Sequence, residues 1–291
     1  MLIHFTKMHG LGNDFMVVDQ ISQKVRLRPE QVRRLSDRNL GVGFDQLLLV
    51  EPPTKPDADF SYRIFNADGS EVENSGNGAR CFAMFVQEKR LTNKKTLTVE
   101  TAGGPLLLTL NDNGQIMVDM GVPRLNPADL PFYAVEQAIS YPLNISALNT
   151  DALNTDALKT AKQQLEIGAV SIGNPHAITR VEDVLNTAVN ELGAAIESHP
   201  LFPKRVNAGF LQVLSRTQGH LRVYERGTGE ILASGTGAAA AMVYGRLQGW
   251  FDSRVEMQLP GGILHLEWLG EGHSVKLTGP AQRVFEGQIY L

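Results

Sequence analysis

Short apolar or alternating runs recur through most of the chain, and this pattern predicts many brief β-strands separated by turns rich in Gly, Asn and Asp. Apolar residues at helical spacing predict four helices, at 29–38, 79–89, 187–198 and 238–248. The expected strands lie at 47–50, 64–66, 97–100, 106–110, 116–120, 169–172, 209–214, 221–225, 255–259 and 263–268. This mixture indicates the α+β class.

One segment of the chain recurs. Residues 65–85 read FNADGSEVENSGNGARCFAMF, and residues 224–244 read YERGTGEILASGTGAAAAMVY. A constant offset of 159 residues aligns them without gaps and places Ser75 on Ser234. This similarity indicates a duplicated chain, with each half built as a sheet wrapped around a largely apolar helix.

Two earlier landmarks precede each copy in the same order. Gly12-Asn13 corresponds to Gly173-Asn174. Next, 43–46 (GFDQ) is matched to 209–212 (GFLQ). Glycine-rich turns resemble one another in many proteins, so the alternative is coincidence. The shared order and the conserved aromatic spacing favour duplication.

A five-residue tandem repeat occupies residues 147–161, which read ALNTDALNTDALKTA. A period of five fits neither the 3.6-residue helix nor the two-residue strand. We therefore interpret the region near 145–163 as an exposed insertion.

Composition excludes several classes of function. The 291 residues are 43% hydrophobic and 20% charged, as in a soluble globular protein of two domains. A net charge of -4 argues against nucleic acid as a partner. Cys81 is the single cysteine, and no Cys/His cluster has zinc spacing, so we expect no metal and no cofactor. No apolar run reaches about 18 residues, so we expect no membrane association and a cytoplasmic location.

The two repeated motifs could bind a carboxylate. Ser75-Gly76-Asn77-Gly78 and Ser234-Gly235-Thr236-Gly237 each lie where a strand leads into a helix. The first turn of a helix has unsatisfied N–H donors and a partial positive charge, so two such turns together would hold an α-carboxylate. A serine N-cap on an ordinary helix is the alternative for either motif alone. The recurrence of the motif in both halves of the chain favours the carboxylate site over two ordinary N-caps.

A carboxylate held in this way would place its α-carbon between residues 75 and 234. Stereoinversion needs one group to remove the α-proton and a second group to deliver a proton to the opposite face. Both groups should titrate near the working pH. A thiol, with a pKa of about 8.5, meets that condition and a serine hydroxyl does not.

Other polar residues cluster around the duplicated landmarks. Glu225 and Arg226 follow a strand-like run, and Asn66 has the position equivalent to Glu225. The planar guanidinium of Arg226 could bind a second carboxylate, although a solvated surface pair is the alternative. The remaining candidates are Asn13, Gln46, Asn174 and Asn207. His176 could orient the groups at 75 and 234, although a lone histidine is more often structural.

Several motifs together closely resemble the diaminopimelate epimerase family. They are HGLGNDF at 9–15, FNADGSE at 65–71, GNGARC at 76–81, GNPH at 173–176 and YERGTGE at 224–230. The resemblance spans nearly the whole chain except 145–163. It implies a pyridoxal-free, metal-free enzyme that interconverts LL- and meso-diaminopimelate in lysine and peptidoglycan biosynthesis.

The resemblance also implies two pseudo-symmetric domains with the active site between them. The first would comprise 1–122 with a returning strand at 278–291, and the second 123–277; homodimers are expected. Gly76, Asn77, Gly235 and Thr236 would bind the reacting α-carboxylate, and His176 and Glu225 would assist the catalytic positions. The rest of the substrate would be held by Asn13, Gln46, Asn66, Asn174, Asn207, Glu225 and Arg226, with Arg226 on the distal carboxylate.

The chain departs from the family at the two catalytic positions. Family members carry cysteine there, whereas this chain has Ser75 and Ser234. We expect it to be inactive or strongly impaired, with substrate binding better preserved. Two alternatives stay open: a non-catalytic binder of a dicarboxylic amino acid, and a related proline racemase-like or phenazine isomerase-like enzyme.

Overall fold

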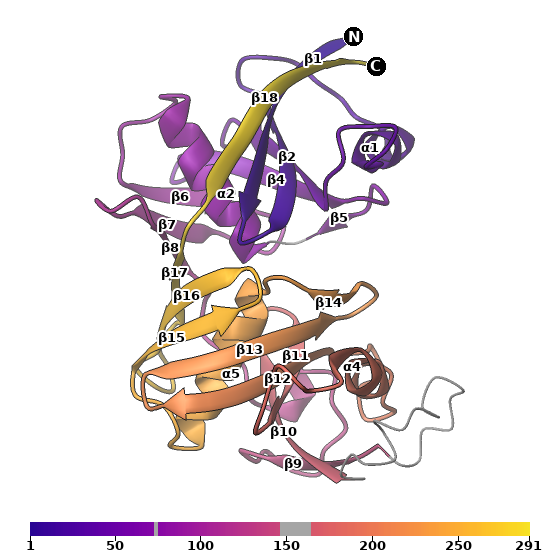
Figure 1. Cartoon of the computed structure of the whole chain (residues 1–291). Helices are drawn as coiled ribbons and strands as arrows, with labels where there is room; N and C mark the ends of the chain where they lie inside the picture. The colour runs from indigo at the N-terminus through magenta and orange to yellow at the C-terminus, as the bar shows by residue number, and fades with distance from the viewer. Residues whose placement is uncertain (73–74, 146–163) are drawn as a thin grey trace. The chain divides into compact units, whose positions relative to one another are not determined.

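The computed structural model describes residues 1–72, 75–145 and 164–291, and the five-residue repeat at 147–161 lies outside them (Figure 1). The chain divides into two compact units, Met1–Asp119 with Thr278–Leu291 (unit 1) and Met120–Leu277 (unit 2). Each unit combines a mixed sheet with helices, so the α+β prediction is confirmed. No helix in the described part is long and apolar enough to cross a membrane.

In its described residues, unit 1 has two helices and a mixed sheet. Its helices are α1 (Pro29–Ser36) and α2 (Gly76–Glu88). Its strands are β1 (Leu2–Gly10), β2 (Asn13–Asp19), β3 (Gln46–Glu51), β4 (Phe60–Asn66), β5 (Glu71–Val72), β6 (Thr96–Glu100), β7 (Leu106–Leu110), β8 (Ile116–Asp119) and β18 (Gln282–Tyr290). β17 (Lys276–Gly279) spans the boundary between the units in the sequence.

Unit 2 has a similar set of elements. The helices among its described residues are α4 (Val189–Glu197), α5 (Gly235–Leu247) and a short 3-10 helix, η1 (Pro127–Asp129). Its strands are β9 (Tyr141–Asn144), β10 (Gln164–Ser171), β11 (Pro175–Arg180), β12 (Asn207–Ser215), β13 (Gln218–Glu225), β14 (Gly229–Ile231), β15 (Arg254–Leu259) and β16 (Gly262–Glu267).

The two sheets repeat one order of pairings. In unit 1, β2 and β3 are parallel, β3 and β4 antiparallel, and β4 pairs with both β5 and β6. In unit 2, β11, β12, β13, β14 and β15 follow the same scheme with the same directions. The duplication visible in the sequence therefore corresponds to a duplicated topology.

The strand register corrects one of the matched landmarks. Phe15 lies opposite Gln46 on the β2–β3 ladder, and His176 lies opposite Asn207 on the β11–β12 ladder. Asn207 is therefore the counterpart of Gln46, and the match of 43–46 to 209–212 is wrong. The cause is conformational: Gly43 lies in the loop before β3 with φ of 73°, whereas Gly209 lies within β12.

The helices α2 and α5 begin three residues earlier than the hydrophobic pattern predicts. Their N-caps are Ser75 and Ser234, whose hydroxyl oxygens accept hydrogen bonds from the N–H groups of Gly78 and Gly237, at 3.2 and 3.1 Å. Because these caps satisfy exposed donors, the helix tolerates glycines in its first turn despite their poor helical propensity. The glycines of both motifs are therefore helical.

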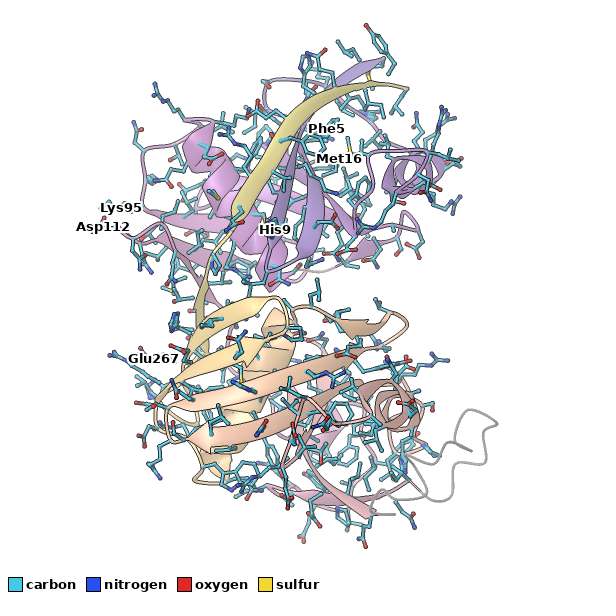
Figure 2. The ribbon with its side chains drawn as sticks, viewed as in Figure 1. Phe5, His9, Met16, Lys95, Asp112 and Glu267 are labelled. Carbon is cyan, nitrogen blue, oxygen red and sulfur yellow. The ribbon has the colours of Figure 1, made fainter. Side chains whose placement is uncertain are left out.

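Each unit has a core of its own. In unit 1, apolar side chains of β1, β2, β3 and α1 pack together, among them Phe5 and Met16 (Figure 2). In unit 2, Leu143, Ile196 and Phe210 belong to an equivalent cluster. The central helices are almost wholly buried, as the prediction of largely apolar helices required.

β18 lies beside β1 as an antiparallel strand, with Leu2 opposite Tyr290 (Figure 1). The N-terminal amine donates a hydrogen bond of 2.7 Å to the carbonyl oxygen of Leu291. The sheet of unit 1 is therefore built from segments at both ends of the described chain.

Candidate active site

In unit 1, three of the amide side chains that the sequence analysis proposed as substrate contacts lie where adjacent strands begin or end. We call this row of strand ends the polar edge of the sheet. The parallel strands β2 and β3 begin there with Asn13 and Gln46, and the antiparallel β4 ends there with Asn66. Gln46 Nε2 donates a hydrogen bond of 3.0 Å to Asn66 Oδ1. The alternation of strand direction therefore gathers residues that are far apart in the sequence.

The first turn of α2 joins this edge. Ser75 caps the helix, and Gly76 and Asn77 are its first residues, both buried. Asn77 Nδ2 donates a hydrogen bond of 3.1 Å to Asn13 Oδ1. The structure thus brings together the candidate site residues of unit 1.

Unit 2 repeats this arrangement with different side chains. Asn207 begins β12 and Glu225 ends β13, while Asn174 directly precedes β11. Asn174 Nδ2 donates a hydrogen bond of 3.3 Å to Thr236 Oγ1 in the first turn of α5, beside Gly235. Both units therefore hold the N-terminus of their central helix against a polar edge of the sheet.

Ser234 is connected to a carboxylate. Its hydroxyl donates a hydrogen bond of 2.8 Å to Glu225 Oε1 while its oxygen accepts from the N–H of Gly237. The side chain is 2% exposed, so this pair is shielded from bulk water. A proton on the Ser234 oxygen therefore has a base within reach, although a hydroxyl releases it only with difficulty near neutral pH.

His176 is a fully buried, neutral imidazole. Burial first, and the positive charge of Arg226 second, lower the pKa of His176 to about 3. Asn174 uses its amide nitrogen as donor to Thr236, so its Oδ1 accepts at 3.1 Å from His176 Nε2. His176 is thus the Nε2–H tautomer, and its buried Nδ1 has no hydrogen-bond partner among the described residues.

Arg226 lies at the exposed end of the unit 2 edge. Its backbone N–H donates to Asn207 Oδ1 at 2.9 Å, and its Nη1 donates to the carbonyl of Lys204 at 2.9 Å. Both acceptors are neutral, so these contacts do not neutralise the positive charge of the Arg226 guanidinium. A guanidinium held at its base in this way is suited to a carboxylate from solution.

Two residues in contact with this set were missed from sequence. Asp45 Oδ2 accepts from Asn13 Nδ2 at 2.9 Å, and Arg80 Nη2 donates to Asn77 Oδ1 at 2.8 Å. Both are adjacent to residues that were singled out, and Arg80 is part of the GNGARC motif. Only the tertiary contacts distinguish them from ordinary surface charges.

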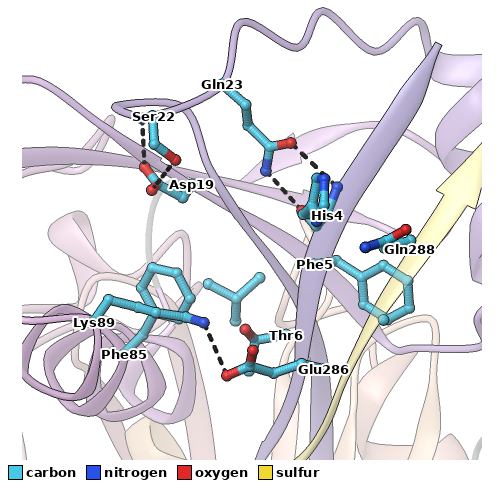
Figure 3. A pocket seen from close by; sticks show the side chains of 12 residues that line it. His4, Phe5, Thr6, Asp19, Ser22, Gln23, Phe85, Lys89, Glu286 and Gln288 are labelled. Carbon is cyan, nitrogen blue, oxygen red and sulfur yellow. Dashed lines mark hydrogen bonds and ion pairs between the residues drawn. The ribbon is translucent and has the colours of Figure 1, made fainter.

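Apart from the Glu225 carboxylate, the groups at these edges are amides, hydroxyls, backbone N–H donors and the Arg226 guanidinium, which suit carboxylates. In residues 1–72, 75–145 and 164–291, no three His, Cys, Asp or Glu side chains are grouped as metal ligands. A pocket of about 390 Å³ in unit 1 lies elsewhere, beside β1, β18 and the C-terminal end of α2 (Figure 3). Its Lys89–Glu286 ion pair of 2.8 Å is remote from the N-terminus of that helix.

A family model described as diaminopimelate epimerase matches residues 5–126 and 168–284. The chain belongs to the diaminopimelate epimerase family. Curated proteins of that name from Pseudomonas entomophila (strain L48) and Stutzerimonas stutzeri (strain A1501) are 57% and 56% identical to it, over 100% of both chains. The resemblance inferred from five motifs is confirmed.

Solved structures show how widely this family's fold is shared. A phenazine biosynthesis protein of the PhzF family from Bacillus anthracis matches with a TM-score of 0.70 at 18% identity, covering 100% of each chain. A probable proline racemase from Agrobacterium radiobacter K84 matches with a TM-score of 0.68 at 16% identity, covering 99% of this chain and 93% of that one. At these identities the similarity establishes the fold alone.

Proposed function

We propose that this chain has the substrate site of a diaminopimelate epimerase, an isomerase of lysine biosynthesis that interconverts LL- and meso-diaminopimelate without a cofactor. One observation carries the proposal: each unit caps its buried central helix with serine and sets the first helical turn against a polar sheet edge. The family membership supports it. A cytoplasmic location is part of the same proposal.

The proposed substrate contacts divide between two carboxylates. Gly76, Asn77, Gly235 and Thr236 bind the reacting α-carboxylate through the N–H groups of the two first turns, where the helix dipoles favour negative charge. Arg226 binds the distal carboxylate. The remaining polar contacts come from Asn13, Gln46, Asn66, Asn174, Asn207 and Glu225.

The proposed reaction is a two-base proton exchange at the α-carbon. The group at 75 or 234 removes the proton from one face, and the group at the other position delivers a proton to the opposite face. Glu225 assists position 234 through its 2.8 Å hydrogen bond, and neutral His176 keeps Asn174 oriented toward Thr236. With serine at both positions, loss of each general acid or base costs about 10²- to 10⁴-fold.

Solvent deuterium incorporation at the α-carbon of LL-diaminopimelate tests the proposal. We expect little exchange with this chain, and rapid exchange with formation of meso-diaminopimelate for Ser75→Cys/Ser234→Cys. Either single replacement should form the meso product slowly, because stereoinversion needs a thiol on both faces. Ser198→Cys, at the exposed end of α4, controls for a thiol that is merely present. Absence of exchange in the double variant would refute the epimerase proposal.

The serines themselves favour a second candidate function, a non-catalytic binder of a dicarboxylic amino acid. Both hydroxyls serve as helix caps, which is a sufficient structural role without proton transfer. The same experiment separates the two functions. Saturable binding of diaminopimelate without exchange, even after both cysteines are introduced, would identify a binder.

We also propose that the chain forms a homodimer through β18. Val284, Phe285 and Tyr290 on this strand are 56%, 46% and 78% exposed, an unusual density of large apolar side chains for one surface strand. A second copy would cover them. Sedimentation equilibrium should give a dimer that Phe285→Glu converts to monomer; a monomeric parent chain would contradict this.

A further inference from the structure

Arg80 is a buried cation beside the N-terminus of α2. Its side chain is fully buried, and its three nitrogens donate to Pro280 O at 3.0 Å, Gly76 O at 3.2 Å and Asn77 Oδ1 at 2.8 Å. All three acceptors are neutral, and the described part of the chain gives Arg80 no carboxylate partner. Such a charge is costly to bury, so an arginine here requires an explanation beyond packing.

Arg80 is charged at neutral pH. Burial lowers its pKa to about 10, which still leaves the guanidinium protonated by a wide margin. A guanidinium has only donors. Its bond to Asn77 therefore fixes that amide with Oδ1 toward Arg80, and the flipped amide would place two donors against each other.

The polarity imposed by Arg80 passes along a chain of amides. With Oδ1 of Asn77 committed, Nδ2 of Asn77 donates to Asn13 Oδ1 at 3.1 Å. Asn13 must then direct its own Nδ2 outward, where it donates to the exposed Asp45 carboxylate at 2.9 Å. Asn13 thus presents a donor to a carboxylate, which is the chemistry the proposed site requires of it.

We propose that Arg80 is a positioning residue that fixes the side-chain amide of Asn77 and, through it, orients Asn13 as a donor to a carboxylate of the substrate. The proposal rests on the proposed function for the identity of that substrate. Arg80 acts through the two amides and contacts no substrate atom itself.

The rest of the fold shows that packing does not require this arginine. The position equivalent to Arg80 in α5 is Ala239, which is fully buried in a helix with the same serine cap. Unit 1 also makes room for the larger side chain. A Cβ atom on Gly10 of β1 would lie 3.1 Å from Arg80 Nη2 and 3.3 Å from Asn77 Cβ.

Calorimetric titration with meso-diaminopimelate tests the proposal in the chain as it is. Arg80→Met keeps the length of the side chain and removes every donor, and we expect binding to weaken about 10- to 100-fold, as for loss of a charge-assisted hydrogen bond. Arg80→Lys should restore part of this loss. Arg63→Met, the same change at an arginine on β4 that is 43% exposed, is the control and should bind as the parent does.

A double-variant comparison separates positioning from a general structural effect. Because Arg80 acts through Asn13, Asn13→Ala should weaken binding, and adding Arg80→Met should weaken it by much less than the product of the two single effects. Gly10→Ala tests the same contact without removing the arginine, because its new Cβ would displace Arg80 Nη2. It replaces Arg80→Met as the test if that variant does not fold, and it should weaken binding several-fold. Binding within twofold of the parent in folded Arg80→Met would overturn the proposal.

A readout without substrate keeps this proposal distinct from the proposed function. In ¹⁵N-labelled free protein, the side-chain amide signals of Asn13 and Asn77, assigned from Asn13→Ala and Asn77→Ala, should shift in Arg80→Met and keep their positions in Arg63→Met. Unmoved signals would overturn the orienting role even if binding changed. If the parent chain does not bind diaminopimelate, the proposed function fails, and these signals still decide the role of Arg80.

Discussion

Replacing His176 by phenylalanine should change how the stability of the chain depends on pH. Phe15 occupies the equivalent place on β2, opposite Gln46, so the fold already accepts phenylalanine at this position of the repeated unit. The pKa of His176 is lowered from 6.5 to about 3 by burial and by Arg226. The folded chain therefore excludes a proton that the unfolded chain binds below pH 6.5.

The sign and the size follow from this difference. A lowered folded-state pKa contributes full stability above the unfolded value, and the contribution is lost as the pH falls toward the folded value. Each pH unit in that window is worth up to about 1.4 kcal/mol for one group. From pH 7 to pH 5, His176 should therefore reduce the free energy of unfolding by about 2 kcal/mol.

Urea denaturation of the parent and of His176→Phe at pH 7, 6 and 5 measures this effect. The variant should gain about 2 kcal/mol relative to the parent between pH 7 and pH 5, whatever the difference between them at pH 7. His273→Phe, the same replacement at an exposed histidine, is the control. A constant difference between His176→Phe and the parent would show that His176 is hydrated or charged in the folded chain.

Two further predictions concern packing and ion pairs. Gly168→Ala should destabilise unit 2 by about 2 to 3 kcal/mol in urea denaturation, because the new Cβ would lie 2.1 Å from the ring of buried Tyr244; an unchanged midpoint would contradict this packing. The equivalent pairs Arg222–Glu230 and Arg63–Glu71 should differ in stability, since the side chains are 20% and 22% exposed in the first and 43% and 37% in the second. Arg222→Met should cost about 2 to 4 kcal/mol and Arg63→Met less than about 1 kcal/mol, and equal losses would refute the role given to burial.

Hydrophobic periodicity predicted the four main helices and the mixed α+β class, because each helix buries a continuous apolar face. It placed the starts of α2 and α5 too late, since Gly76 and Gly235 are poor helix formers and only the serine caps reveal that the helix has begun. β1 was not predicted, because its pattern is interrupted by polar residues such as Lys7, which is buried beside Asp14.

The recurring amides were found through the internal repeat, and their contacts were not. Recurrence singled out Asn13 and Asn174. Gln46 was matched to Gln212 because the two short segments have similar sequences, but the strand register makes Asn207 the counterpart of Gln46. Arg80 also donates a hydrogen bond to the carbonyl of Pro280, 200 positions away. A contact of that range leaves no local signal in one sequence.

The pairing of β1 with β18 has a consequence for folding during synthesis. Met1 and Leu291 are hydrogen-bonded across 290 positions, so the first strand leaves the ribosome long before its partner exists. At about 5–20 residues per second, roughly 15 to 60 s separate the two. Unit 2 can fold within that interval, whereas the sheet of unit 1 must wait with one edge unprotected. Nascent chains should therefore depend on chaperones chiefly through their earliest segment, and release of the final strand should be the step that ends this dependence.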